Sequence, residues 1–264
     1  MLFIYIVGEW LFMANNYGYQ NEFDFVLLFN NKHLYELDNN SQKFMKDLFD
    51  DNINSDDIII SWKNKMVQKT DFFIKCRNYI KNISLKCGNS NFVHHEQIQE
   101  FIRYLGKIGI PFTTIENYVG YHYGYLKDED GKNDYTKKLS SEEYKSLYQC
   151  DIDEFNKAIN KTRIIIDMID RFIIRGRTSD YDIDALVCGL TDNYVWIKKY
   201  DLYDLILSKR CLDYSSPHIA CLTIGPKKRN LDGFSKNVKD RYLVCIRWNF
   251  IRESIIEYKK NLAK

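Results

Sequence analysis

The chain has 264 residues, of which 45% are hydrophobic and 28% charged, enough for one large or two modest domains around a real core. This composition excludes a disordered chain, a collagen and a disulfide-stabilised miniprotein. The apolar opening MLFIYIV is shorter than the roughly 20 residues that cross a bilayer, and it lacks the basic start of a secretory signal. We therefore expect a soluble cytoplasmic protein, with translation starting at Met1 or Met13.

The cysteines and the charge distribution further limit the class of protein to which the chain can belong. The seven cysteines are scattered and mostly lie in apolar runs such as ALVCGL, which is typical of reduced core residues. The net charge of +2 hides an asymmetry, because residues 197–264 hold fifteen Lys and Arg against seven Asp and Glu, a net +8. A polyanion would suit this basic quarter best, although a merely solvated basic surface is the alternative.

In chain order, the first part of the sequence predicts helices. Apolar residues recur at helical spacing over residues 21–37, and a second helix is expected over 41–49. A third is expected over 55–66, where Ser55 can cap the first turn. The N-terminal segment is therefore predicted to be helical.

The pattern changes to strand alternation over residues 71–76 and 83–87. If these strands form a hairpin whose tip lies just before Tyr79, antiparallel pairing places Asp71 opposite Lys86. Polar side chains of both strands then share one face, and the apolar side chains share the other.

A helix is expected to follow over residues 94–109, with Glu96 and Glu100 one turn apart on a common face. After Pro111 we expect a Tyr-rich helix and then a polar loop over 127–139. Further helices are expected after the Ser140–Glu143 capping box, over 151–171, over 200–209 and after Phe250, and strands over 184–189, 194–199, 218–224 and 242–248.

Asp71, Lys86 and a glutamate from the adjacent helix form a set suited to phosphodiester hydrolysis. This reaction uses a divalent metal held by oxygen ligands, and often a cation near the attacking water or scissile phosphate. Alternation along the strands puts Asp71, Ser84 and Lys86 on one face, and Glu96 or Glu100 would complete the set. The alternative is a surface hairpin with a solvated aspartate and lysine.

The stretch TDFFIKCRNYIKNISLK resembles the PD-(D/E)XK nuclease superfamily, which includes most Type II restriction endonucleases. Ser84 stands where the second strand of the family normally carries an acidic residue. Some members with Ser or Thr there recover the carboxylate from a following helix, a role that the resemblance assigns to Glu96 or Glu100, with Glu96 favoured. Glu22 matches the family's first-helix glutamate by position. The resemblance covers about a third of the chain.

The resemblance implies an α/β fold with a restriction-endonuclease-like mixed sheet core flanked by helices and a basic C-terminal portion that contains a sheet. It implies an Mg²⁺-dependent endonuclease that cuts double-stranded DNA as a homodimer, with a cognate DNA methyltransferase in the same system. Asp71, a helical glutamate and Glu22 would hold the metal. Lys86 would orient the water or stabilise the transition state. Ser84 would form a hydrogen bond that supports the metal ligands without binding the metal itself. The nuclease core would lie in residues 1–126 and the DNA-contacting portion in 127–264, or both in one continuous domain.

The loop between the last two predicted strands is rich in basic residues. Lys and Arg neutralise phosphates, and Arg and Asn also read base edges in the major groove. The alternative is a solvated hairpin whose lysines discourage edge-to-edge association. The residues predicted to contact DNA are Asn91, His94, Lys227, Lys228, Arg229, Asn230, Lys236, Lys239 and Arg241.

The sequence gives less support to other activities. A zinc site at His94 and His95 would need Cys76 and Cys87, which the strand register assigns to the core face. A Cys–His protease would need a reactive thiol, whereas the cysteines have apolar neighbours. Because Ser84 removes a carboxylate, a catalytically inactive nuclease fold that binds nucleic acid stays open, as does a repair or RNA-cleaving nuclease on the same scaffold.

Overall fold

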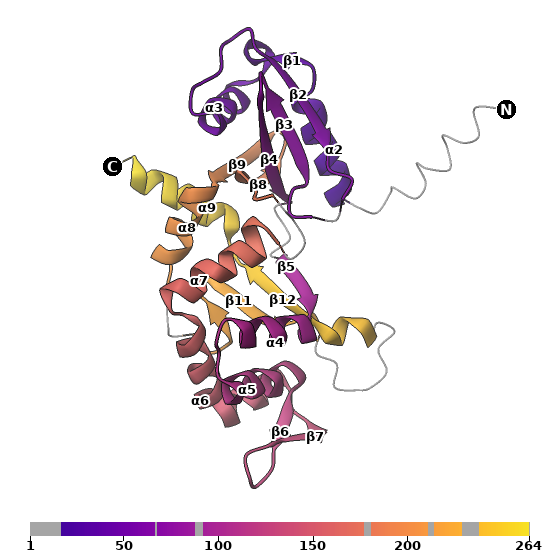
Figure 1. Cartoon of the computed structure of the whole chain (residues 1–264), viewed down its shortest axis with the longest axis vertical. Coiled ribbons are helices and arrows are strands. Elements are labelled where there is room, and N and C mark those ends of the chain that lie inside the picture. The colour runs from indigo at the N-terminus through magenta and orange to yellow at the C-terminus, as the bar shows by residue number, and fades with distance from the viewer. Residues whose placement is uncertain are drawn as a thin grey trace, which may run out of the picture. The chain divides into compact units, whose positions relative to one another are not determined.

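The structure is a computed structural model of the whole chain, and it describes residues 17–66, 68–87, 92–176, 181–210, 214–228 and 238–263 (Figure 1). The chain forms two compact units. The first takes its described residues from Met1–Ser90, Ile174–Leu202 and Ile251–Lys264, and the second takes its own from Asn91–Ile173 and Tyr203–Phe250. The polar loop over residues 127–139, where the predicted DNA-contacting portion would begin, lies inside the second unit.

A mixed six-stranded sheet forms the centre of the first unit, in the order β1-β2-β3-β4-β8-β9. Strands β4 and β8 run parallel, and the other neighbouring strands run antiparallel. The α/β class with a mixed sheet flanked by helices is thereby confirmed. The strands are β1 (Lys32–His33), β2 (Ile58–Lys63), β3 (Phe72–Cys76), β4 (Tyr79–Lys86), β8 (Ala185–Leu190) and β9 (Asn193–Lys198).

Helices α2 (Tyr17–Phe29) and α3 (Asn39–Leu48) cover one face of this sheet. Their apolar residues join those of the strands in one buried cluster, in which Phe25 stacks on Phe72 with the ring centroids 5.9 Å apart. The Asp38 side chain caps α3 by accepting hydrogen bonds from the backbone N–H groups of Asn40 and Ser41. Helix α9 (Ile251–Leu262) packs along β8 and β9.

Two predictions in this region were wrong. Residues 55–66 contain strand β2 instead of a helix, because β2 is held in the sheet between β1 and β3 and alternates between buried and exposed side chains. The helix predicted over 21–37 ends at Phe29, and a short strand and a 3₁₀ turn (η1, Leu34–Glu36) follow it.

The β3–β4 hairpin forms as predicted but with a different register. Phe72 pairs with Ile83 and Cys76 with Tyr79, so the turn consists of two residues, of which Arg77 has a positive φ of 53°. The pairing is displaced by two residues from the predicted one, which would have placed Asp71 opposite Lys86. Because side chains alternate with a period of two, this displacement leaves every side chain on its predicted face.

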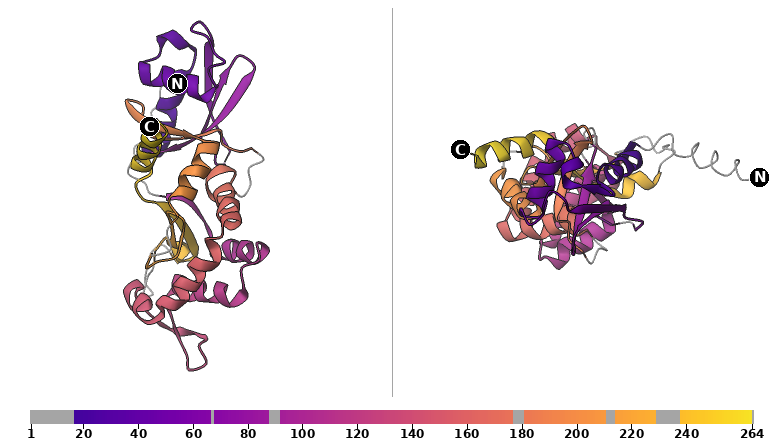
Figure 2. Two further views of the ribbon diagram at one scale, coloured as in Figure 1. Left: turned by 90° about the vertical axis from the view of Figure 1, so that its left-hand side faces the viewer. Right: turned by 90° about the horizontal axis from the view of Figure 1, so that it is seen from above.

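The second unit contains a four-stranded antiparallel sheet in the order β10-β11-β12-β5 and a separate two-stranded hairpin, β6–β7. The hairpin projects from its unit as a narrow ribbon, as Figure 2 shows from a second direction. The strands are β5 (Phe92–Gln97), β6 (Tyr125–Lys127), β7 (Asn133–Lys138), β10 (His218–Ile219), β11 (Leu222–Pro226) and β12 (Leu243–Trp248). The helical segments are α4 (Ile98–Lys107), α5 (Phe112–Tyr123), α6 (Ser141–Ile159), α7 (Thr162–Ile169), the π-helical turn η2 (Asp170–Ile174) and the 3₁₀ turn η3 (Val238–Tyr242). Helix α8 (Lys199–Ser208) begins in the first unit and continues into the second.

Helix α6 begins at the predicted capping box, where the Ser140 hydroxyl accepts from the Glu143 N–H and the Glu143 carboxylate accepts from the Ser140 N–H. The single helix predicted over 151–171 is instead broken after Ile159. The buried Asn160 side chain accounts for the break, because its amide donates to the His218 carbonyl and its oxygen accepts from the Ala220 N–H.

The helix predicted from residue 94 starts at Ile98, because residues 92–97 pair with β12 as strand β5. Glu96 therefore lies on a strand and Glu100 on a helix, and the two do not share a helix face as predicted. In the part of the chain that the structure describes, no helix has the length and apolar character needed to cross a membrane.

Candidate active site

Asp71 lies just before β3, where the β3–β4 ladder ends. Its N–H donates to the Ile83 carbonyl at 2.8 Å, and its Oδ2 accepts from the Leu85 N–H at 2.6 Å and from the Ser84 hydroxyl at 3.2 Å. The carboxylate thus takes the position that a backbone carbonyl would occupy in a continued ladder. Three hydrogen bonds to one strand fix the position of this half-buried aspartate.

Lys86 lies two residues beyond Ser84 on the same face of β4 and is half-buried. Among the described residues it forms no ion pair. In the parallel ladder it is the partner of Cys188, whose thiol has its pKa raised to about 11 by burial, while the charges of Arg252 and Lys86 oppose that shift. Lys86 therefore lies on the strand face that carries Ser84, and no described carboxylate forms an ion pair with it.

Asn21 is a residue of this site that the sequence did not single out. It is buried on α2, and its amide donates to the Gly189 carbonyl at 3.0 Å and to the Cys87 sulfur at 3.3 Å. These bonds connect α2 to the end of β4, directly after Lys86. The sequence signal for Asn21 was an amide side chain at the start of an apolar helix pattern, directly before Glu22, which we had selected instead.

Glu22, the predicted metal ligand on α2, forms an ion pair with Lys63 of β2 at 2.6 Å. The Lys63 ammonium also lies 3.0 Å from the centre of the Tyr19 ring. No described contact joins Glu22 to Asp71. The role of Glu22 as a metal ligand therefore stays a prediction.

Glu96 and Glu100 lie in the second unit, where each has a cationic partner. Arg171 donates to both oxygens of Glu96, at 3.2 and 2.5 Å, and His94 lies 3.7 Å from Oε2. Burial raises the pKa of Glu96, but His94 and Arg171 outweigh it and hold the pKa below its usual value. Glu100 pairs with Arg103 at 2.6 Å.

A divalent metal can be tested against the donor atoms around Asp71. Within the described residues, no group of three or more His, Cys, Asp or Glu side chains could hold a metal ion. Mg²⁺, however, often takes only one or two carboxylates and completes its shell with water and substrate phosphates. The described donors occupy Oδ2 of Asp71 and leave Oδ1 available, so the donor set fits such a partly hydrated ion.

The two cysteines considered for a zinc site differ in their surroundings. Cys76 is fully buried in the core cluster of the first unit, and Cys87 is half-buried against the Asn21 amide. Burial raises the pKa of the Cys76 thiol, which disfavours the thiolate that zinc would need.

Part of the predicted DNA-contacting set lies around the β11–β12 connection. Lys227, Lys228 and Lys239 are exposed there, and Lys227 pairs with Asp240 at 3.0 Å. Arg241 differs, because its Nε and Nη2 atoms are buried. His94 is largely buried between Glu96 and the Phe172 ring. The remaining predicted contacts, Asn91, Arg229, Asn230 and Lys236, lie outside the described residues.

A cluster of tyrosines adjoins the η3 turn. Tyr123 packs on Tyr125 and on Tyr242 with ring centroids 5.2 and 6.4 Å apart, and Tyr125 packs on Tyr135. Tyr135 and Tyr242 are exposed. Exposed aromatic rings beside lysines can stack on bases. The run YHYGY was the sequence signal for this cluster, and we had interpreted it only as part of a helix.

The fold is therefore an α/β fold with a mixed, helix-flanked sheet, in which Ser84 of β4 contacts Asp71 and Lys86 lies two residues further along β4. Among solved structures, the chain is similar to one described as the restriction endonuclease MspI in complex with its cognate DNA. The sequences are 13% identical, the match covers 88% of this chain and 92% of that one, and the TM-score is 0.48. No family model and no curated protein matches the sequence. A score this low does not assign an activity, which must be inferred from the residues of this chain.

Proposed function

We propose that the protein is a metal-dependent endonuclease that hydrolyses phosphodiester bonds of double-stranded DNA. The observation that carries this proposal is the Asp71 carboxylate, which is held by Ser84 and Leu85 of β4, two and one residues before Lys86 on that strand. The resemblance of the sequence to the PD-(D/E)XK motif supports the same roles for this aspartate and lysine.

Each residue would have a distinct task. Bound Mg²⁺ would stabilise negative charge on the scissile phosphate and lower the pKa of a water molecule. Asp71 would hold the ion through Oδ1, while Ser84 and the Leu85 N–H keep Oδ2 in place. Lys86 would orient the attacking water or stabilise the charge that develops on the phosphate. A second carboxylate would come from Glu22, Glu96 or Glu100.

The DNA would lie against the basic segment of the second unit. Lys227, Lys228 and Lys239 would neutralise phosphates, and the neighbouring Arg229, Asn230 and Lys236 belong to the same proposed surface. A Type II restriction enzyme acting as a homodimer on a two-fold symmetric site is the form of activity we favour. A DNA methyltransferase in the same system would then protect the host's own sites.

A second candidate is a catalytically inactive nuclease fold that binds DNA. It is favoured by Ser84, which supplies a hydroxyl where the motif has a carboxylate, and by the missing three-residue metal cluster among the described residues. A repair or RNA-cleaving nuclease on the same scaffold is a variant of the first proposal with a different substrate.

Incubation of the purified protein with supercoiled plasmid DNA, with Mg²⁺ and with excess EDTA, separates these candidates. Discrete fragments that require Mg²⁺ would support a restriction enzyme, and a smear would point to a less specific nuclease. Binding without cleavage in a gel-shift assay would favour the inactive module. Neither cleavage nor binding of DNA or RNA would refute both proposals.

A further inference from the structure

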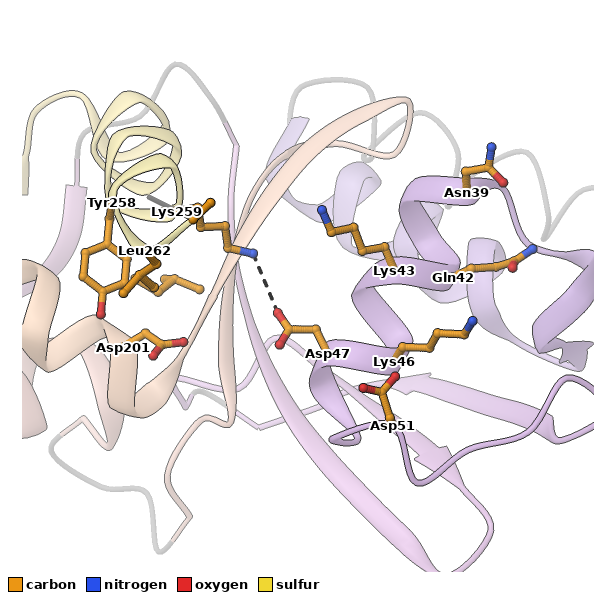
Figure 3. Close-up of a pocket in the computed structure, with 12 residues that line it drawn as sticks. Asn39, Gln42, Lys43, Lys46, Asp47, Asp51, Asp201, Tyr258, Lys259 and Leu262 are labelled. Carbon is orange, nitrogen blue, oxygen red and sulfur yellow. Dashed lines mark ion pairs between the residues drawn. The ribbon is translucent and has the colours of Figure 1, made fainter.

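A cavity of about 690 Å³ lies in the first unit, beside strand β9 (Figure 3). In the sheet, β8 separates β9 from β4, the strand that carries Lys86. Its walls are α3 on one side and α9 on the other, with residues of β9 and the start of α8 between them. The volume is in the range of sites that bind small molecules. The residues that matter for its chemistry are Lys43, Lys46, Asp51, Asp201, Tyr258 and Lys259.

Lys259 has one carboxylate and one aromatic ring as its described contacts in this cavity. Its ammonium lies 3.7 Å from the Asp47 carboxylate and 3.8 Å from the centre of the Trp196 ring. Asp47 is shared, because it also accepts from the Trp196 N–H at 2.5 Å and lies 3.3 Å from Lys198. An ammonium group has three donors, so this long contact leaves donors of Lys259 available to the cavity.

The charge on Lys259 is also poorly stabilised. Burial lowers its pKa to about 8, the nearby charge of Lys43 acts in the same direction, and Asp47 only partly offsets them. Lys43 and Lys46 lie one turn apart on α3 and form no ion pair with a described residue. In Figure 3, Lys43 and Lys259 extend into the space between α3 and α9 from opposite sides. An anion placed between them would relieve their repulsion and occupy their free donors.

We propose that this cavity binds a phosphate monoester that carries hydroxyl groups, such as a sugar phosphate or a nucleoside monophosphate. The phosphate would lie between Lys43 and Lys259, with Lys46 nearby. Asp51 and Asp201, on opposite walls, can accept hydrogen bonds from sugar hydroxyls. The ring of Tyr258 and the side chain of Leu262 provide apolar surface for the rest of the ligand.

Isothermal titration calorimetry on the full chain tests the proposal with four probes: inorganic phosphate, ribose 5-phosphate, adenosine monophosphate and adenosine. We expect both phosphate esters to bind more tightly than inorganic phosphate, and adenosine not to bind. Equal affinity for the two esters would identify phosphate and sugar as the recognised groups, whereas tighter binding of adenosine monophosphate would show that the base packs against Tyr258. Absence of binding by both esters would overturn the proposal.

Matched variants test whether the phosphate ester binds in this cavity. Lys43→Ala and Lys259→Met should each weaken ester binding about tenfold or more, because each removes a charge-assisted contact. Lys260→Met changes the next residue of α9, which is exposed and does not line the cavity, and should leave the affinity unchanged. Equal effects of Lys259→Met and Lys260→Met would refute the site. Lys86→Ala should also bind the ester normally, so this result is independent of nuclease activity.

Discussion

The Ser84 hydroxyl donates a hydrogen bond to the Asp71 carboxylate, 3.2 Å away, across the end of the β3–β4 ladder. In the motif that the sequence resembles, an acidic side chain would occupy the serine position, and two carboxylates would then face each other. Here a neutral donor holds the aspartate instead. In the function we propose, the second strand would therefore orient the metal ligand and would not itself bind the metal.

The first prediction concerns Lys86. Lys86→Ala should reduce DNA cleavage at least about a hundredfold, because it removes the positive charge beside the reacting phosphate, and it should leave DNA binding nearly unchanged. Lys75→Ala is the matched control, since Lys75 lies on β3 on the same face of the sheet and should tolerate the change. Full cleavage by Lys86→Ala in a plasmid assay would contradict the proposed role.

The second prediction separates orientation of Asp71 from simple stability. Ser84→Ala removes a buried hydrogen bond and should lower the free energy of unfolding by about 1 kcal/mol. Ser61→Ala should cost a similar amount, because the buried Ser61 hydroxyl donates to the Val26 carbonyl at 2.6 Å in the same unit. Urea denaturation and cleavage rates should show that only Ser84→Ala also slows cleavage. An equal loss of activity in both variants would indicate a structural effect alone.

The third prediction concerns salt dependence. Lys227→Ala combined with Lys228→Ala should weaken DNA binding and reduce the slope of log affinity against log salt by about 1 to 2, because each phosphate contact contributes about 0.9. The double variant Lys132→Ala and Lys137→Ala removes two exposed lysines of the same unit and serves as the control. Fluorescence anisotropy at several salt concentrations measures both slopes. If the first pair leaves the slope unchanged, DNA does not contact this segment.

The fourth prediction concerns Glu96 and Arg171. The folded state lowers the pKa of Glu96, so the pair stabilises the fold above the usual glutamate pKa, and this contribution is lost as the pH falls through the lowered value. Arg171→Met leaves a buried carboxylate without its partner and should cost about 3–5 kcal/mol near pH 7. Urea denaturation should show that stability increases from pH 4 to pH 7 more steeply in the native protein than in Arg171→Met.

The same pair of residues yields a control for the metal-ligand role. The double variant Glu96→Gln and Arg171→Met removes both charges and should recover part of the lost stability. If Glu96 holds the metal, this double variant should fold but should need more Mg²⁺ for cleavage than the native protein. An unchanged Mg²⁺ dependence would leave Glu96 with a structural role in its own unit.

The sequence predicted the hairpin and the face of its polar residues, but not its register. Alternation identifies a face with a period of two, so Asp71, Ser84 and Lys86 could be grouped correctly without knowledge of their opposite partners. The register depends on where the turn falls. Arg77 adopts a positive φ of 53° without being glycine or asparagine, so its residue type does not indicate that the turn begins there.

Strand β2 and the second half of β5 were predicted as helices for a related reason. Residues 58–63 form a short apolar run that fits either period, and residues 94–97 directly precede a strong helical pattern, so local pattern alone cannot decide between strand and helix. Pairing with distant strands decides it, since β2 lies between β1 and β3, and β5 pairs with β12, about 150 residues away in sequence. The position of Glu96 on a strand could not be obtained from the residues around it.

The first unit is assembled from three separate segments of the chain, since α2 to β4 precede the second unit, β8 and β9 follow α7, and α9 follows β12. Strand β4, which carries Ser84 and Lys86, pairs with β8, about 100 residues further along the chain. The sheet therefore cannot be completed around these residues until the chain has been made as far as β9. Pairing over so long a separation in sequence is slow to form, so we expect this sheet to limit the folding rate of the first unit.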